Sequence, residues 1–193
     1  MNVHGKHPHL VAAAGVLTAL AFLTAACTTN KTTGAPPPSP AKTSATPTPS
    51  VDPSVADAEQ QARAAYTGYI QTWAIASQAA DPDNPDLPRY VADPLLSLTR
   101  HNLRVIKDKG AVQRGAQKAT VLSVKVDLSG RPQTVTINSC IDYSDLKLVF
   151  KSNGSPVPNS AITEPKVPAV VTVAKYTTGQ WLVNESKQGS HPC

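Results

Sequence analysis

The sequence is poor in residues that bind metals. It contains three cysteines and five histidines in 193 residues. Two of these histidines, His101 and His191, fall in residues 55–193, the part that is long enough to fold as a domain. A structural zinc site takes four ligands, mostly Cys and His. We therefore expect no metal site, and His101 is better explained as a helix-surface residue.

The motifs of the common enzyme classes are missing as well. The chain has no Gly-x-Ser-x-Gly, His-Glu-x-x-His, phosphate-binding loop or Cys-x-x-Cys. The acidic stretch DPDNPD at 81–86 could offer oxygen ligands to Ca²⁺. However, the sixth and twelfth positions, which are Gly and Glu in an EF-hand, are Asp86 and Ala92. The stretch therefore predicts a Pro/Asx turn, and we expect no cofactor.

A long apolar run is also missing. The run from Leu10 to Phe22 has about 13 residues, whereas a membrane-spanning helix needs roughly 20. A short basic region followed by such a run is typical of a secretory signal, which here covers residues 1–26.

The expected signal ends at a cysteine. The segment Leu23-Thr24-Ala25-Ala26-Cys27 resembles the bacterial lipobox, with Leu23 one position earlier than the pattern prefers. The resemblance implies that the Cys27 thiol receives a diacylglyceryl group and that the signal is cut before it. Acyl chains would then hold the protein at the extracytoplasmic face of the cell membrane. The alternative is an ordinary secretory signal with an incidental cysteine.

Residues 27–54 predict a tether. After Cys27 the segment contains seven prolines, seven threonines and four serines, and Val51 is its one large aliphatic residue. Such a composition cannot bury enough apolar surface to offset the entropy of ordering. We expect a disordered segment that carries a single domain, residues 55–193. That domain is only weakly basic and is expected outside the cytoplasm, so nucleic acid is not an expected partner.

Helical periodicity marks two segments of the domain. The first runs from Val55 to Ala80, with Ser54 as its expected cap, and the prolines of DPDNPDLPRY end it. The second starts at Asp93-Pro94 and ends at Gly110. The expected apolar face of the first helix consists of Val55, Ala62, Tyr66, Tyr69, Ile70, Trp73 and Ala80. That of the second consists of Leu95, Leu98, Asn102, Val105 and Ile106.

From residue 119 onward the pattern changes to strands. Alternating or β-branched runs predict strands at 120–128, 133–143 and 146–151, followed by a hairpin of 169–176 and 180–185. Prolines between 156 and 168 predict a loop. In the second strand the apolar face holds Val135, Ile137, Ile141 and Tyr143, and the other face holds Thr134, Thr136, Asn138, Cys140 and Asp142. Helices followed by an antiparallel meander predict an α+β fold.

Cys140 and Cys193 are expected to form a disulfide, because unpaired thiols are uncommon outside the cytoplasm. Cys140 lies on the polar face of its strand. The tail from Ser186 is therefore expected to cross that face and cover part of Thr136 or Asn138. Any pocket would then open on the other face, towards the helices.

The order of elements resembles the nuclear-transport-factor-2-like cone, which ketosteroid isomerases share, and the chain resembles a common type of actinobacterial surface lipoprotein. The resemblance rests on the aromatic first helix, DPDNPDLPRY, INSCIDYSD, the late GQW and the terminal cysteine, and it covers most of residues 55–193. It implies a long N-terminal helix plus short helices packed on a curved antiparallel sheet around a pocket. This fold hosts enzymes, small-ligand binders and dimerisation modules, so it does not fix the function.

Aromatic residues are candidates for the wall of that pocket. Tyr66, Tyr69 and Trp73 on the first helix, and Trp181 near the end of the chain, could line it. An aromatic stripe at helical spacing is, however, more often plain core. A basic stripe between Arg100 and Lys118 is either a solvated helix face or a contact for an anionic partner.

Two classes of function remain open. The leading one is a membrane-anchored, non-catalytic module that binds an envelope protein or a small apolar ligand. The alternative is a small isomerase or hydratase with Asp142 or His101 as general base, beside a tyrosine. A desolvated carboxylate next to a tyrosine in the pocket would favour the enzyme, and a closed or purely apolar pocket would favour the module.

Overall fold

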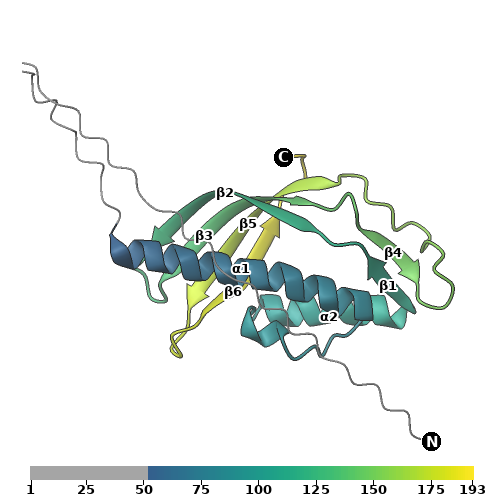
Figure 1. The fold of residues 1–193 in the computed structure, drawn as a ribbon, viewed down its shortest axis with the longest axis horizontal. Helices are drawn as coiled ribbons and strands as arrows, with labels where there is room; N and C mark the ends of the chain where they lie inside the picture. The colour runs from purple at the N-terminus through teal and green to yellow at the C-terminus, as the bar shows by residue number, and fades with distance from the viewer. Residues whose placement is uncertain (1–51) are drawn as a thin grey trace, which may run out of the picture. The chain divides into compact units, whose positions relative to one another are not determined.

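A computed structural model describes residues 52–193 of the protein. The expected signal, the Cys27 anchor and the tether up to residue 51 lie outside the described residues. The described part has two α-helices and six antiparallel strands, so the predicted α+β class is confirmed (Figure 1). Neither helix in residues 52–193 is long and apolar enough to cross a membrane.

Helix α1 spans Pro53–Ala79 and begins two residues before the expected boundary at Val55. Asp52 caps it: its Oδ1 accepts hydrogen bonds from the Ser54 backbone N–H at 2.8 Å and from the Ser54 hydroxyl at 2.7 Å. The expectation that Ser54 is the cap is therefore wrong. Pro53 takes the first helical position, which needs no N–H, and the cap therefore lies at Asp52, two residues before Ser54.

Helix α2 spans Leu95–Asp108 and follows a short 3₁₀ turn at Leu87–Arg89. The helix begins one residue after Pro94, next to the predicted start at Asp93-Pro94. Asp93 Oδ1 accepts a hydrogen bond from the Ser97 backbone N–H at 3.1 Å. Gly110 follows the helix with a positive φ of 64°, as expected of a residue that ends a helix.

The expected apolar face of α2 is wrong in its rotation. Leu95, Thr99 and Leu103 are the buried residues, whereas Leu98 is 52% exposed and Val105 is 38% exposed. The helix is fixed by Leu103, which packs in a cluster with Ala76 of α1 and Leu87. The spacing of Leu98 and Val105 predicts that they share a buried helix face. In the described residues that side of the helix is not covered by another element, so both side chains stay exposed.

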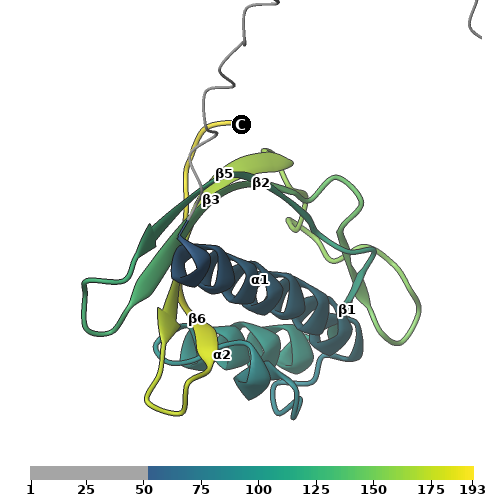
Figure 2. The same ribbon diagram turned by 60° about the vertical axis from the view of Figure 1, so that its left-hand side comes forward.

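Four strands form the main antiparallel sheet in the order β2-β3-β5-β6. They are β2 (Lys118–Asp127), β3 (Thr134–Asp142), β5 (Lys166–Lys175) and β6 (Trp181–Gln188). Figure 2 shows this sheet arching over α1, with α2 on the opposite side of α1. These strands confirm the predicted ones to within a few residues.

The remaining strands differ from the expected meander. β1 (Ala111–Arg114) was not predicted, and β4 (Lys147–Phe150), predicted at 146–151, pairs with β1 instead of joining the main sheet. β1 is too short to show an alternating pattern.

Pro168 lies inside β5, although the prolines around it predicted a loop. The carbonyl of Pro168 accepts a hydrogen bond from the Gly189 N–H. In an antiparallel strand the nitrogen and the carbonyl of one residue point to the same side, so the Pro168 nitrogen also points towards β6. The last pair between these strands is Ala169 with Gln188. No paired residue of β6 therefore lies opposite the proline that lacks an N–H.

The core lies between α1 and the inner face of the sheet. Each fully buried Val or Ile side chain is worth about 1.5–3 kcal/mol relative to an exposed one. The α1 side of this core is built from small residues, including Ala58, Ala62 and Ala65. The sheet side is built from branched residues with no exposed surface: Val135, Ile137, Val171, Val173 and Val183.

The Cys140–Cys193 disulfide is present, with its two Cα atoms 6.0 Å apart. Cys140 lies on the outer face of β3, because the alternating residues of this strand are buried on the inner one. The expected path of the tail is wrong, since Ser186 still belongs to β6. The tail after Gln188 bonds to β5 instead: Gly189 N–H donates to Pro168 O, and Cys193 N–H donates to Lys166 O.

The tail therefore crosses the sheet at the end of β3. Pro168 lies opposite Cys140, and Lys166 lies opposite Asp142. Thr136 and Asn138, which the tail was expected to cover, pair with β5 further along the strand.

Removal of the disulfide should destabilise the domain. The two cysteines are 53 residues apart, and closing a loop of that length is worth about 4 kcal/mol in the chain-entropy description. The double variant Cys140→Ser/Cys193→Ser should lose about 2–5 kcal/mol of unfolding free energy in urea titrations. Reductant should destabilise the wild-type protein and leave the double variant unchanged. A wild-type midpoint that does not move in reductant would contradict a stabilising role.

Candidate functional site

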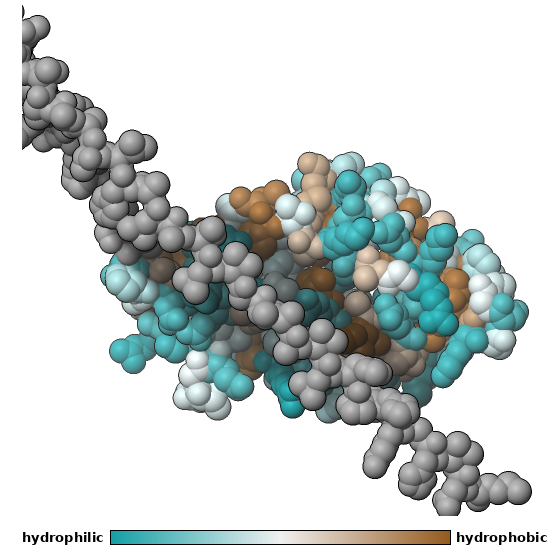
Figure 3. Space-filling model, in the orientation of Figure 1, coloured by the Kyte–Doolittle hydropathy of each residue, from teal (hydrophilic) through white to brown (hydrophobic). Residues whose placement is uncertain are grey.

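A cavity of about 790 Å³ lies between the two helices, the end of β3 and the β1–β4 ribbon. Its size is within the range of about 300–1,000 Å³ that is usual for small-ligand pockets. Segment 157–164 forms a further wall. Figure 3 shows hydrophobic side chains set back at the centre of one face of the molecule, with hydrophilic ones around them.

The structure brings three of the four predicted pocket residues together. Tyr66, Tyr69 and Trp73 of α1 line the cavity. Trp181 does not, so its prediction is wrong. It is 6% exposed and belongs to the core cluster, and the Lys175 ammonium lies 6.0 Å from the centre of its ring.

The cavity is on the face of the sheet where the sequence placed it. Ile141 of β3 and Tyr143, which directly follows the strand, line it. Ile141 belongs to the buried face of β3, opposite the face that carries Cys140. The disulfide and the cavity therefore lie on opposite sides of the same strand end.

Three tyrosines are among the polar residues that line the cavity. Tyr66 Oη lies 2.9 Å from Ser139 Oγ, a buried pair. Tyr143 Oη accepts a hydrogen bond from Gln188 Nε2 at 2.5 Å, which leaves its own proton available to donate.

Burial keeps these phenols protonated. It raises the pKa of Tyr66 and Tyr69 above the ordinary value of 10, and it raises the pKa of Tyr143 to about 12. The neighbouring tyrosines reinforce the pKa rise of Tyr69 and Tyr143, which places the three phenols close together. At neutral pH all three are hydrogen-bond donors rather than anions.

Two polar groups of the cavity wall have no hydrogen-bond partner in the described structure. Thr99 is 1% exposed, and its Oγ1 is buried without a partner. The Thr99 hydroxyl is close enough to Tyr69 to offset part of the pKa rise, but the two hydroxyls do not form a well-aligned bond. Gln113 Oε1, on β1, is likewise buried and unpartnered. Such groups normally find a protein or water partner.

Charge is confined to exposed residues of the wall. Among residues 52–193, the charged side chains that line the cavity are Lys109 and Glu164, both of exposed residues. Neither Asp142 nor His101 lines it. His101 is an exposed residue of α2, as the sequence predicted.

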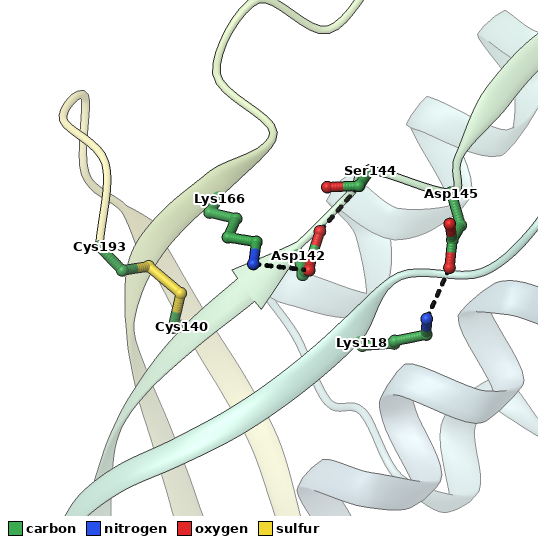
Figure 4. A network of polar contacts seen from close by, with 7 residues as sticks. All are labelled: Lys118, Cys140, Asp142, Ser144, Asp145, Lys166 and Cys193. Atoms are coloured by element: carbon green, nitrogen blue, oxygen red, sulfur yellow. Dashed lines mark hydrogen bonds and ion pairs between the residues drawn. A yellow bond between two sulfur atoms is a disulfide. The ribbon is translucent and has the colours of Figure 1, made fainter.

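Asp142, the other candidate base, lies on the outer side of the strand end in a cluster of polar groups (Figure 4). Its Oδ1 accepts a hydrogen bond from the Ser144 N–H at 2.9 Å, and its Oδ2 lies 3.3 Å from the Lys166 ammonium. The Ser144 hydrogen bonds, supported by Lys166, lower the pKa of Asp142 from 3.8 to about 2. A carboxylate held so firmly in its ionised form is a poor proton acceptor.

The predicted basic stripe is interrupted at its end. Arg104, Lys107 and Lys109 are exposed on and just after α2. Lys118 is paired with Asp145, with its ammonium 2.6 Å from the carboxylate. An anionic partner would therefore meet mainly the residues of α2.

Sequence reasoning missed Thr99 as a wall residue. It lies four positions after Leu95, which is one turn along the same helix face. That spacing indicates that Thr99 lies on the buried face of α2. Thr99 was missed because the apolar face was assigned from apolar residues alone. Gln113 carried no such signal, because β1 itself was not predicted.

Comparisons with known proteins assign no family. No protein-family model matches the chain, and no curated protein matches it. Among solved structures, the intermembrane space region of chloroplast protein ARC6 matches with a TM-score of 0.40 and 15% sequence identity. The match covers 72% of this chain and 98% of that one.

The Asp142 carboxyl should stay ionised far into the acid range. Its pKa is lowered to about 2 in the folded protein, against about 3.9 for an unfolded Asp. Because the folded pKa is the lower one, its stabilising effect is complete above about pH 5 and is lost as the pH falls through about 2. An NMR titration should give a midpoint near 2, and Asp142→Asn should lose less stability than wild type between about pH 4 and 2. A midpoint above 4 would contradict this stabilisation of the ionised carboxyl.

Proposed function

We propose that this protein is a lipid-anchored lipoprotein of the cell envelope whose domain binds a small, largely apolar ligand without converting it. The cavity carries the proposal. It has the volume of a ligand pocket, aromatic and aliphatic walls, and neutral hydroxyl groups at its inner end. Such a combination of apolar surface with a few placed polar groups is typical of small-molecule sites.

We also propose that the domain is a nuclear-transport-factor-2-like cone. The arrangement in its favour is a long helix held under an arched antiparallel sheet (Figure 2), with a cavity lined by both helices and the end of β3. The position of the cavity between α1 and the inner face of β3 agrees with a pocket enclosed by a curled sheet.

Binding is favoured over catalysis by the positions of the two candidate bases. A general base must lie within hydrogen-bond reach of the proton it removes. Asp142 lies on the other face of its strand, bonded to Ser144 and paired with Lys166, and His101 lies on the exposed surface of α2. The tyrosines are held protonated, which suits them to hold an oxygen rather than to accept a proton.

An anchor at Cys27 would keep such a domain next to a bilayer, which is a source of apolar ligands. Two acyl chains are enough for stable attachment. Leu98 of α2 and Ile162 of segment 157–164 both belong to the cavity wall and are exposed, so an apolar molecule could contact them from outside.

A ligand should co-purify with the protein. We expect native mass spectrometry of the protein from its own membranes to show a small bound species that organic solvent extracts. The variant Leu95→Trp puts a larger side chain into the cavity wall on α2 and should lower the occupancy. Ligand-free protein from every source, with no response to added lipids, would contradict the binding function.

The anchor should depend on Cys27 alone. We expect intact mass to show acylation at Cys27, and Cys27→Ser to release the protein from the membrane fraction. Cys193→Ser serves as the control, since it removes a thiol of the disulfide and should leave the protein membrane-bound. Wild-type protein that is soluble and unacylated would rule out the anchor while leaving the cavity unaffected.

A further inference from the structure

The inner end of the cavity holds polar groups that the protein itself leaves unsatisfied. Thr99 Oγ1 is buried without a partner, and the Thr99 side chain is close enough to Tyr69 to lower the pKa of that phenol in part. Gln113 Oε1 is a second unpartnered acceptor of the same wall. A buried polar group without a partner is destabilising, so its presence needs an explanation outside the packing of the core.

We propose that the ligand is an uncharged lipid that carries a hydroxyl group, and that this hydroxyl binds between Tyr69 and Thr99. The inference rests on the proposed binding function and specifies its ligand. A hydroxyl is both a donor and an acceptor. It can accept a hydrogen bond from the Tyr69 hydroxyl and donate one to Thr99 Oγ1, so that both groups have a partner.

The distribution of charge selects against ionised ligands. The charged side chains of the described wall, Lys109 and Glu164, have opposite signs and belong to exposed residues. No cation within residues 52–193 lines the inner end, where a carboxylate would have to be neutralised. No unpaired anion there would attract an ammonium group. A charge taken out of water without a partner costs far more than a hydroxyl with two hydrogen bonds.

The apolar residues of the cavity determine the chemistry of the rest of the ligand, apart from its hydroxyl. The apolar residues of the wall include Ile70 and Trp73 of α1, Leu95 of α2, Leu148 of β4 and Val157. These side chains suit an alkyl or isoprenoid body rather than a sugar. The exposed apolar pair Leu98 and Ile162 extends the same surface to the outside.

Binding can be followed through one tryptophan. Trp73 lines the cavity, whereas Trp181 is buried in the core. The test uses the mature chain, residues 27–193, with Cys27→Ser, so that no attached acyl chain occupies the cavity. The probes are 1-dodecanol, dodecanoate and dodecyl methyl ether, titrated at pH 8. Trp73→Phe should abolish the fluorescence response and leave the Trp181 emission.

We expect 1-dodecanol to bind about tenfold or more tightly than dodecanoate, because the carboxylate must be buried as an anion. The ether accepts a hydrogen bond but cannot donate one, so it should bind about three- to tenfold more weakly than the alcohol. Dodecanoate that binds as tightly as the alcohol would overturn the ligand class while supporting the binding function. A Trp73 signal that responds to none of the probes would count against the binding function itself.

Two variants test the assigned hydroxyls. Tyr69→Phe and Thr99→Val should each weaken 1-dodecanol by about three- to tenfold, the worth of one hydrogen bond, and Thr99→Val should remove the preference for the alcohol over the ether. Tyr90→Phe, outside the cavity, is the matched control and should change nothing. Thr99→Val should also raise the melting temperature, because it removes an unpartnered buried hydroxyl. Unchanged alcohol affinity in both variants would overturn the proposed binding position.

Discussion

The packing of α1 under the sheet is the interaction on which the rest of the domain depends. In its first half α1 presents Ala58, Ala62 and Ala65, and the branched inner face of the sheet closes directly on them. From Tyr66 onward the helix carries larger side chains, and the cavity begins there. The first half of α1 therefore forms the core, and the aromatic side chains of its second half form a wall of the cavity. Gly68 supports this arrangement, because a Cβ at that position would collide with the ring of Tyr90.

Stability and the proposed binding function would make opposite demands on the wall of this cavity. The core between α1 and the sheet consists of apolar residues and of the satisfied pair Tyr66–Ser139. Thr99 breaks this rule on the facing helix, where an apolar residue of the same shape would pack without an unpartnered group. Proteins keep such local conflicts mainly where function requires them. Thr99 is therefore more informative about the proposed ligand than the aromatic residues, which would serve equally well as core.

The main elements could be predicted because each carries a strong local signal. Long helical periodicity, prolines at 82–88 and strict alternation in β3 gave the helix, its end and the inner face of the sheet. The corrections have a common cause, since each depends on contacts between distant segments. The rotation of α2 is fixed by Leu103 against Ala76 and Leu87, the pairing of β4 depends on a four-residue strand, and Pro168 is tolerated because β6 ends opposite its neighbour.

The candidate site shows the same division. The aromatic residues of α1 were accessible to sequence reasoning because helical spacing put them on one face. Trp181 looked equivalent by residue type, yet it lies in the core cluster, and only the packing of β6 shows this. The polar wall residues were missed for different reasons: the spacing of Thr99 from Leu95 indicated its helix face but not its burial, and Gln113 lies on a strand that was not predicted. Asp142 was placed on the outer face by alternation alone, and this already argued against its role as a base.

The disulfide and the cavity meet at one strand end, which ties the stability of the fold to the shape of the site. Cys140 lies three residues before Tyr143, and Cys193 follows five residues after Gln188. Tyr143 and Gln188 are bonded to each other in the cavity wall. The crosslink thus holds together the ends of the two strands that carry this pair, although the bond itself lies on the outer face. Its loss would loosen the cavity wall before the core under β3 and β5, because that core is held by the side chains of α1 and not by the tail.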